Sequence, residues 1–326
     1  MISGDHFSLL ALAILLDAAL GDPDFLWRRV PHPVAILGAF IGVLDRWMNR
    51  DQLSDQWRRL LGAIAILIVV EAAALVGFIL QLELARVPFG WIGTAVVASV
   101  LIAGRSLHEH VSAVAAGFRS GGIEAARSAV ARIVGRDPAS LDEARICRAA
   151  IESTAENFSD GVVAPAIWFL LLGLPGLLAY KAINTADSMI GHLNTRYRDF
   201  GWAAARLDDL VNLPASRIAG ALIALAAPFA GGTIATAFRT MLADAGKHRS
   251  PNAGWPEAAM AGALGLALAG PRRYSGVIVN DPFLNERGRR EARPDDIDRG
   301  LRVYLVANAA LFAVVVAVAL VIWLLR

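Results

Sequence analysis

Charged residues are scarce in this chain of 326 residues: Asp, Glu, Lys and Arg make up 18% of it, whereas 56% is hydrophobic. An average soluble domain is about one quarter charged and just under one half apolar. One globule of this size cannot hide so much apolar surface, so the composition predicts a membrane protein. It excludes disordered, collagen-like and disulfide-scaffold chains. The single cysteine, Cys147, excludes an internal disulfide.

Several common functional signatures are also missing. The sequence contains no Walker A motif and no dinucleotide fingerprint, so any nucleotide must be bound by another route. No set of Cys and His residues offers a zinc site, and no G-x-S-x-G nucleophile is present. The net charge is only +2, which gives no reason to expect a nucleic-acid partner. The residues before the first apolar run include no Lys or Arg, so no cleavable signal peptide is expected.

Long apolar runs predict an all-α, polytopic helical membrane protein. The runs at 60–82 and 303–325 are long enough to span a bilayer without interruption. Others are interrupted, or so short that they predict interfacial or re-entrant helices as readily as spans. We expect about five spans. The interrupted runs are 89–103, 162–180, 213–230 and 258–270, and the short runs are 7–20 and 34–48.

The polar stretches between these runs hold most of the chemistry. No internal repeat or linker divides the chain, so we predict one membrane domain over 1–326. A polar insertion at about 104–161 shows helical periodicity at 123–134 and 140–155. The stretch 271–302 holds eight arginines, and arginine-rich loops tend to stay on the cytoplasmic side. We expect the helical insertion to be cytoplasmic. Placing all the polar stretches on that side requires even numbers of crossings between them, so either some of the interrupted runs are re-entrant or some loops face the other way.

Three acidic residues, Glu152, Glu156 and Asp160, follow one another at i, i+4 and i+8. On a helix that ends at Gly161 they form one acidic stripe. Carboxylates on one face repel unless a cation lies among them, and Mg²⁺ suits an oxygen-rich site that also binds phosphate. The alternative is a solvated helix face. The stripe runs directly into the apolar segment that starts at Val162, which favours the functional interpretation.

Two further polar clusters follow the next apolar run. Asn184, Asp187 and Gly191 share one helical face. In the second cluster, Asp208 or Asp209 with Asn212 forms an oxygen-rich group of the Mg²⁺ type, and Arg206 and Arg217 could hold phosphate in fork geometry. Snorkelling arginines with aspartate partners are the alternative. Ionisable groups that border membrane segments are expensive and usually functional, so the clusters together favour an active site.

Two isolated residues need separate interpretation. Prolines flank His32 and fix its backbone, so this histidine could be a ligand, a base or only a turn residue. Glu71 lies in the middle of the run at 60–82, where a carboxyl is costly. We expect Glu71 to face another helix, either protonated or paired with a polar group, and not to be catalytic.

The motifs quoted next occur in a fixed order. They are Gly21-Asp22-Pro23, Pro31-His32-Pro33-Val34, Glu152-Ser-Thr-Ala-Glu156-Asn157, Asp160-Gly161, Asn184-Thr-Ala-Asp187-Ser188-Met189-Ile190-Gly191, Ala205-Arg206-Leu-Asp208-Asp209 with Asn212, and Pro214-Ala-Ser-Arg217. Together they closely resemble the adenosylcobinamide-phosphate synthases, the CobD/CbiB family of cobalamin biosynthesis. The resemblance covers about 15–304. One stretch, 280–286, differs from the glycine-rich, lysine- and proline-containing pattern of that family.

The resemblance implies a multi-pass enzyme of the cell inner membrane whose active site faces the cytoplasm. Such an enzyme is an ATP-dependent carboxylate–amine ligase. It joins adenosylcobyric acid to an aminoalcohol phosphate, either (R)-1-aminopropan-2-yl phosphate or ethanolamine phosphate, and gives adenosylcobinamide phosphate. Mg²⁺ is the implied cofactor and ATP a co-substrate. The lipid bilayer is a further partner, while a homo-oligomer and a complex with other cobalamin-pathway enzymes both remain open.

This chemistry assigns roles to the polar residues as a hypothesis. The acids divide Mg²⁺ binding and general-base catalysis between them, the amides orient phosphate or metal, the cations neutralise phosphate, and His32 contacts substrate. The expected catalytic acids are Glu152, Glu156, Asp160, Asp187, Asp208 and Asp209, of which all but Asp160 are candidate metal ligands. The expected substrate and phosphate ligands are His32, Asn157, Lys181, Asn184, Arg206, Asn212 and Arg217.

Two other classes of function compete with this hypothesis. A membrane transferase that binds a Mg²⁺-diphosphate through two Asp-rich motifs needs more spans than this chain offers. A non-catalytic membrane sensor or transporter could share the fold. Transporters often contain inverted repeats, whereas this chain has no repeat and carries its acids at segment ends. The presence of all the motif blocks favours the enzyme.

Overall fold

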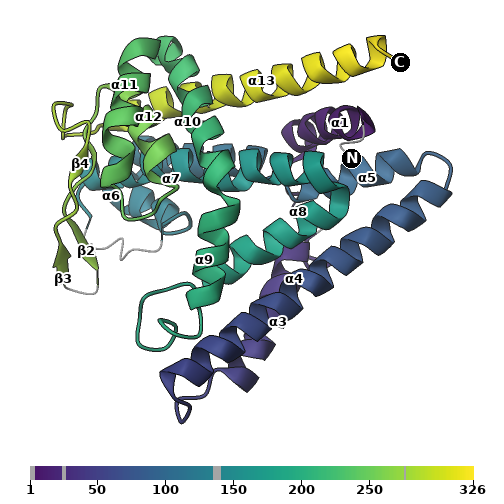
Figure 1. Ribbon diagram of the computed structural model, residues 1–326. Helices are drawn as coiled ribbons and strands as arrows, with labels where there is room; N and C mark the ends of the chain where they lie inside the picture. The colour runs from purple at the N-terminus through teal and green to yellow at the C-terminus, as the bar shows by residue number, and fades with distance from the viewer. Residues whose placement is uncertain (1–3, 24–26, 135–140, 275–276) are drawn as a thin grey trace. The chain divides into compact units, whose positions relative to one another are not determined.

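The computed structural model describes residues 4–23, 27–134, 141–274 and 277–326, and most of them are helical (Figure 1). The chain folds into two compact units that alternate along the sequence. Unit 1 comprises 1–103, 164–212 and 315–326, and unit 2 comprises 104–163 and 213–314. The predicted polar insertion at 104–161 therefore belongs to the same unit as most of the C-terminal half.

Unit 1 is built around two helices, α4 and α8, which pack side by side (Figure 1). The contact face of α4 is rich in small residues, including Gly62, Ala65, Ala73 and Gly77. A Cβ atom on Gly77 would lie 2.6 Å from the carbonyl oxygen of Leu174, so only glycine permits this close approach. The helices that the structure describes in unit 1 are α1 (Gly4–Leu20), α3 (Pro33–Met48), α4 (Asp55–Arg86), α5 (Gly90–Val100), α8 (Ala164–Ile190), α9 (Trp202–Val211) and the end of α13 (Pro294–Leu324).

Helix α8 bends at Gly173, where the backbone adopts a φ of 69°, and Pro175 follows two residues later. Such a bend frees backbone groups, which need other partners inside a membrane. The side chain of Gln81 on α4 supplies one, because its Oε1 accepts a hydrogen bond of 2.9 Å from the Leu174 N–H. The interruption that the sequence predicts in the run at 162–180 is thus a bend within a helix.

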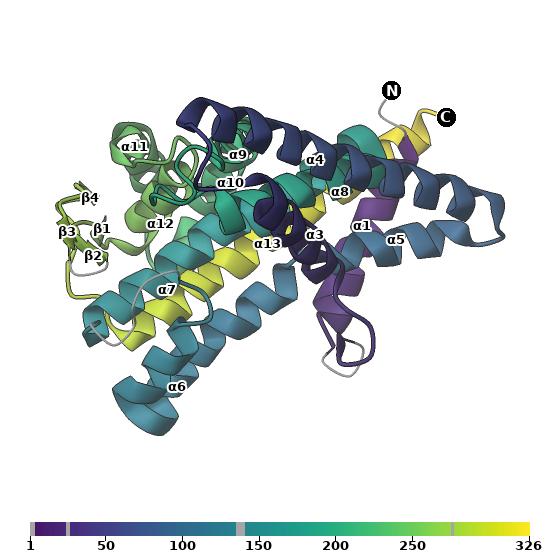
Figure 2. The ribbon, with the colours of Figure 1, turned by 90° about the horizontal axis from the view of Figure 1, so that it is seen from below.

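Unit 2 contains further helices and two short antiparallel strand pairs. Helix α6 packs against α7 (Figure 2), and α10, α11 and α12 pack against one another. Strand β1 pairs with β4, and β2 pairs with β3. The elements are α6 (Gly104–Val130), α7 (Glu143–Phe158), the π-helical turn η2 (Ser159–Val163), α10 (Leu213–Ala226), η3 (Ala227–Ala230), α11 (Ile234–Asp244), η4 (Ala245–Lys247), α12 (Gly254–Leu264), β1 (Leu268–Ala269), β2 (Arg272–Tyr274), β3 (Val277–Val279), β4 (Phe283–Leu284) and most of α13 (Pro294–Leu324).

Among the described residues, five helical segments are long and apolar enough to cross a membrane, which confirms the predicted class and number of spans. The run at 258–270 is not one of them: α12 ends at Leu264, and the chain then enters β1. The apolar helix at 6–20 is shorter than the five. The five segments are Asp55–Arg86, Gly90–Val130, Glu143–Ile190, Leu213–Ala230 and Pro294–Leu324.

Two local predictions from the sequence are wrong. Gly161 does not end a helix, because α7 continues through the π-helical turn η2 directly into α8. Gly161 is buried in that turn, which packs against α10. Glu71 does not face another helix of the described chain but is exposed on α4. The periodic stretches at 123–134 and 140–155 correspond to parts of α6 and α7, except that residues 135–140 lie outside the described residues.

Candidate functional site

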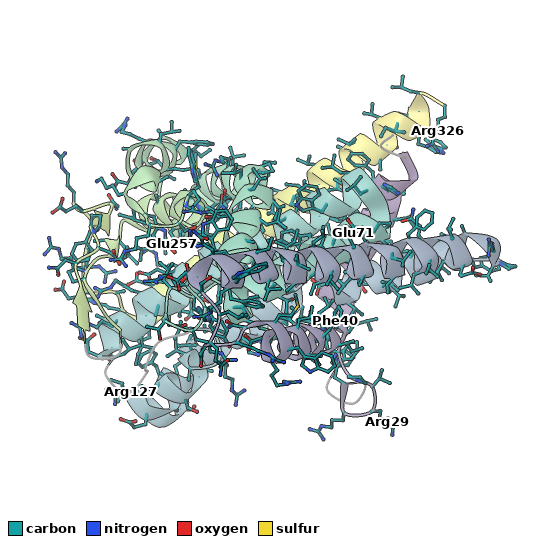
Figure 3. All side chains as sticks on the ribbon, turned by 60° about the horizontal axis from the view of Figure 1, so that its bottom comes forward. Arg29, Phe40, Glu71, Arg127, Glu257 and Arg326 are labelled. Atoms are coloured by element: carbon teal, nitrogen blue, oxygen red, sulfur yellow. The ribbon has the colours of Figure 1, made fainter. Side chains whose placement is uncertain are left out.

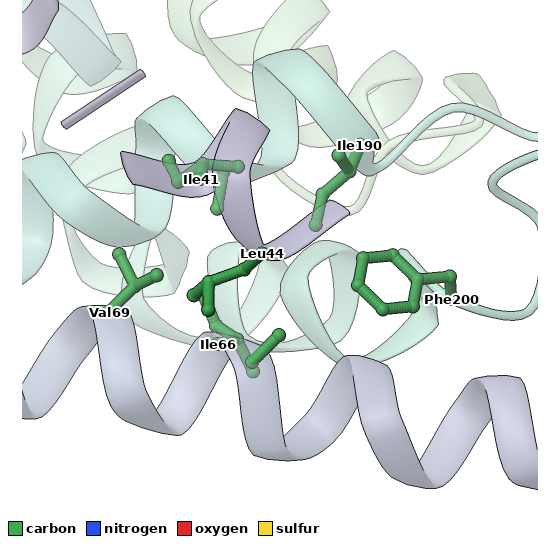
Figure 4. Close-up of a pocket in the computed structure, with 8 residues that line it drawn as sticks. Ile41, Leu44, Ile66, Val69, Ile190 and Phe200 are labelled. Atoms are coloured by element: carbon green, nitrogen blue, oxygen red, sulfur yellow. The ribbon is translucent and has the colours of Figure 1, made fainter. Parts of the chain in front are cut away.

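The last turns of α8 carry the first acid of a polar cluster in unit 1. Ala186 and Ile190 face an apolar core formed with α3 and α4 (Figure 4), whose remaining void is only about 10 Å³. This packing fixes the rotation of α8 and presents the neighbouring residue, Asp187, at a half-buried position. Helix α8 ends three residues later, and the Gly191 N–H donates to the Asp187 carbonyl at 2.7 Å.

Position 191 requires glycine because the Asp187 side chain lies against it. A Cβ atom there would collide with Oδ1 of Asp187. The space beside Gly191 is therefore the space that the Asp187 carboxylate occupies. This contact explains the spacing of Asp187 and Gly191 that the sequence displays.

Helix α9 packs against α8 and carries the second acid of the cluster, Asp208, which is buried. Asn184 on α8 donates from Nδ2 to Oδ1 of Asp208 at 3.4 Å. The hydroxyl of Tyr180 donates to Oδ1 of Asn212 at 2.9 Å, and both of these residues are buried. Tyr180, Asn184 and Asp187 lie on one face of α8, so the structure brings together the two predicted clusters on either side of residues 191–201.

The surroundings of Asp208 change its acidity. Burial and the nearby charge of Asp187 raise the pKa of this carboxyl, and the amides of Asn212 and Asn184 lower it. Burial dominates, so the pKa rises from 3.8 to about 7. The pKa of Asp209 is also raised by burial, and Arg206 acts in the opposite direction. Asp208 is thus an acid that exchanges its proton near neutral pH, which is typical of functional sites.

The connection from α8 to α9 is tied to the rest of unit 1 by two ion pairs whose carboxylates are buried. Arg196 donates from Nη2 to Oδ2 of Asp45 on α3 at 2.8 Å. Arg59 on α4 donates to Oδ1 of Asp199 at 2.9 Å, and Asp199 is buried. The carboxylates of both pairs are buried, whereas Arg196 and Arg59 are about half exposed. These pairs fix the path between the two helices that carry Asp187 and Asp208.

Other predicted residues of unit 1 lie in different settings. His32 caps α3, because its Nδ1 accepts from the Val34 N–H at 3.2 Å, and its Nε2 lies 3.6 Å from Asp22. This geometry matches the turn-residue alternative for His32. Arg206 is exposed and lies 3.5 Å from Oδ2 of Asp209. Lys181 is buried on α8, one residue after Tyr180.

The predicted acidic stripe of unit 2 is not a uniform exposed face. Glu152 is buried, and its Oε1 accepts a hydrogen bond of 2.7 Å from the Ala269 N–H. Glu156 is exposed, and Asp160 is half-buried in the π-helical turn. The Nδ2 atom of Asn157 donates back to the Ser153 carbonyl at 2.9 Å. Glu152 therefore holds a backbone donor in place, which is a structural role that the sequence spacing does not indicate.

Arg217 of unit 2 has a fixed orientation. Its Nη1 donates to the Leu213 carbonyl and to Oδ1 of Asn252, both at 3.0 Å, and its guanidinium carbon lies 4.6 Å from the centre of the Trp255 ring. A guanidinium held in this way is pre-organised for an oxyanion. Asn252 and Trp255 are contacts that the sequence does not reveal, because no spacing rule connects them to Arg217.

The fit of these residues to Mg²⁺ can be judged from their chemistry. Among the described residues, no group of three or more His, Cys, Asp or Glu side chains is arranged to hold a metal ion. Asp187 and Asp208 nevertheless offer two carboxylates beside the amide of Asn184. Mg²⁺ is usually held by one or two carboxylates and completes its shell with water and substrate phosphate. The unit 1 cluster therefore fits Mg²⁺ in the presence of a phosphate-bearing ligand.

The fold and the site define a polytopic helical membrane protein with a buried carboxyl that titrates near neutral pH, beside a second acid. Comparison with known proteins identifies its relatives. The model of the CobD/CbiB protein family matches residues 10–304, so the chain belongs to this family. No solved structure matches.

Proteins named cobalamin biosynthesis protein CobD are similar over nearly their full lengths. The protein from a Sinorhizobium species is 52% identical over 96% of this chain and 98% of its own length. The protein from Brucella anthropi is 50% identical over 96% of this chain and 97% of its own. A protein from Rhodobacter capsulatus is 47% identical over 97% of this chain and 98% of its own.

Proposed function

We propose that this protein is an enzyme of cobalamin biosynthesis that forms an amide bond between adenosylcobyric acid and an aminoalcohol phosphate, with ATP as co-substrate. The product is adenosylcobinamide phosphate. Membership of the CobD/CbiB family and the names of its relatives support the pathway. The observation that carries the proposed chemistry is the buried Asp208, whose pKa of about 7 suits a proton acceptor at physiological pH.

The reaction needs activation of the carboxyl group, because a carboxylate does not react with an amine. We propose that the propionate oxygen of adenosylcobyric acid attacks the γ-phosphorus of ATP, which gives an acyl phosphate and ADP. The amine then attacks the acyl carbon, and inorganic phosphate leaves. Phosphoryl transfer of this kind depends mainly on positioning and on neutralisation of charge.

The residues of unit 1 have complementary roles in this scheme. The amine substrate arrives as an ammonium, and the Asp208 carboxylate takes its proton so that the nitrogen lone pair can attack. Asn184 orients Asp208 through the hydrogen bond from Nδ2. Asp187 with the Asn184 amide oxygen would hold Mg²⁺, and the chemistry that the bound ion supplies is neutralisation of charge on phosphate oxygens.

Arg217 has a separate role in unit 2. Its guanidinium, held over Trp255 and by Asn252, would bind a phosphate group of a substrate. We further propose that the protein lies in the inner membrane with its polar clusters toward the cytoplasm, where ATP is available. The arginine-rich stretch at 271–302 supports this orientation.

A turnover assay on purified protein in nanodiscs tests this function. The reaction mixture contains adenosylcobyric acid, MgATP and (R)-1-aminopropan-2-yl phosphate, and mass spectrometry detects the corrinoid product and ADP. We expect product only when ATP, Mg²⁺ and the amine are all present, and ethanolamine phosphate is the second amine to test. Folded protein that binds the corrinoid without forming product would refute the ligase and favour a sensory relative.

The pH dependence of this reaction tests the proposed base. We expect kcat/KM to fall as the pH decreases into the acidic range, because Asp208 then gains its proton. Mg²⁺ held by Asp187 would lower the pKa of Asp208 below its metal-free value of about 7, so the midpoint should lie below 7. Asp208→Asn should lower kcat/KM at least about 100-fold, which is the usual range for loss of a general base. Asp209→Asn, which changes the neighbouring and more exposed acid, is the matched control and should retain the acidic limb of the profile.

A further inference from the structure

Glu71 is an acidic residue in the membrane-spanning part of unit 1. It lies midway along α4 (Figure 3), in a segment with a mean hydropathy of 2.8. Its side chain is exposed, and it makes no hydrogen bond or ion pair with any residue that the structure describes. A carboxyl group at this depth is costly unless another polar group meets it, because lipid tails offer no hydrogen bond.

Glu71 lies on the side of α4 opposite to the contact with α8. It is two residues after Val69 and two before Ala73, and both of these are buried. At about 100° per residue, it therefore points about 160° away from each of them. A row of exposed apolar residues lies on the same face as Glu71. The members of this row are Leu60, Ile64, Leu67, Leu75, Phe78 and Leu82.

The row has a regular period that suits another long helix. Leu60, Glu71 and Leu82 are 11 residues apart, and so are Ile64 and Leu75, and Leu67 and Phe78. An 11-residue repeat corresponds to about 3.67 residues per turn, so the row stays on one side of a nearly straight helix. A partner helix can follow the row along its whole length, with Glu71 at the midpoint of the contact.

We infer that a second copy of this chain covers this face, with α4 against α4 across a two-fold axis along the membrane normal. Two copies in the same membrane have the same orientation, so each residue of the row meets its own counterpart. The second copy therefore places its own Glu71 carboxyl group at the same depth in the membrane. The protonated form of a carboxyl group both donates and accepts a hydrogen bond. Two Glu71 side chains can therefore satisfy each other, whereas an unrelated partner must supply a polar group at that same depth.

Cysteine cross-linking in lipid vesicles tests the arrangement directly. Leu75 and Val76 are adjacent, and their exposed fractions are similar at 58% and 50%, but they point about 100° apart. We expect mild oxidation to link Leu75→Cys into a species of twice the mass, whereas Val76→Cys stays monomeric. The unaltered protein is the blank, because Cys147 is buried. Equal linking of both variants, or linking of neither, would overturn the arrangement.

The role of Glu71 is tested by the dissociation constant of the dimer, measured from energy transfer between labelled copies as the vesicles are diluted with lipid. Polar contacts between membrane helices correspond to about a 5- to 30-fold change in affinity. We expect a loss of this size for Glu71→Leu and a smaller loss for Glu71→Gln, which keeps a donor and an acceptor. An unchanged dissociation constant for Glu71→Leu would refute the pairing of the two carboxyl groups. The dimer itself would be refuted if energy transfer between labelled copies did not exceed the level expected from random proximity. If Glu71→Leu does not fold, the cross-linking of Leu75→Cys still decides the arrangement.

Discussion

Asparagine at position 208 is expected to make the protein more stable at pH 8, although it removes a group of the proposed site. The pKa of Asp208 is raised from 3.8 to about 7 in the folded protein, mainly by burial. Between these two values the folded state binds the proton more tightly than the unfolded state does. The free energy of unfolding of the natural protein therefore decreases as the pH rises from about 4 to about 7, and it stays low above that.

The magnitude follows from the change in pKa. At about 1.4 kcal/mol per pKa unit, the rise from 3.8 to about 7 corresponds to at most about 4 kcal/mol. Asp208→Asn keeps an oxygen that can accept from Asn184 Nδ2 and removes the buried charge. We expect the free energy of unfolding of the variant to exceed that of the natural protein by about 2 to 4 kcal/mol at pH 8 and by almost nothing at pH 4.

Denaturant unfolding in mixed micelles without Mg²⁺, followed between pH 4 and pH 8, measures this difference. Asp209→Asn is the matched control, because the Asp209 side chain is 30% exposed and pairs with Arg206. Exposed pairs of this kind contribute about 0 to 1 kcal/mol, and this variant keeps Asp208. The difference in free energy of unfolding between Asp209→Asn and the natural protein should therefore change little with pH. An Asp208→Asn variant that is less stable than the natural protein at pH 8, or a difference that does not change with pH, would refute the reasoning.

Three further substitutions test single contacts. Gly191→Ala should displace the Asp187 carboxylate and lower turnover about 10-fold or more. Gly246→Ala is its control, because a Cβ atom at that position would contact no other atom. Glu152→Ala should lower the free energy of unfolding by about 1 to 3 kcal/mol, because it leaves the Ala269 N–H without its acceptor, whereas Glu152→Gln should recover most of this loss. Gln81→Leu should destabilise the bend of α8 by a similar amount, measured as a lower unfolding midpoint; no change would contradict the bond that we describe.

The sequence predicts the large features of this fold well, because they depend on local patterns. Apolar runs of sufficient length predicted about five spans, and the break around Gly173 is a bend in α8. The motif spacing also grouped Asn184 with Asp187 on one helical face. What the sequence could not supply was the contact between Asn184 and Asp208, which are 24 residues apart and come together only because α8 and α9 pack.

Other features escape the sequence analysis for the same reason. Glu152 seemed equivalent to Glu156 by spacing, yet its partner is a backbone N–H at Ala269, 117 residues away. Gly161 has the residue type that ends helices, but here it is buried in a π-helical turn that packs against α10. Tertiary contacts decide such cases. The face of Glu71 was likewise fixed by the packing of α4 on α8, which its own sequence neighbours do not reveal.

The central claim is that unit 1 builds an acid whose proton exchanges near neutral pH at Asp208. Infrared difference spectroscopy detects this directly, because a protonated carboxyl has a C=O band that the carboxylate lacks. Spectra of the purified protein in Mg²⁺-free nanodiscs, taken across the range from acid to mildly alkaline pH, should contain a band that disappears with a midpoint of about 7 and that is missing in Asp208→Asn. The absence of any carboxyl band that disappears with a midpoint near neutral pH, or the persistence of that same titrating band in Asp208→Asn, would contradict the account.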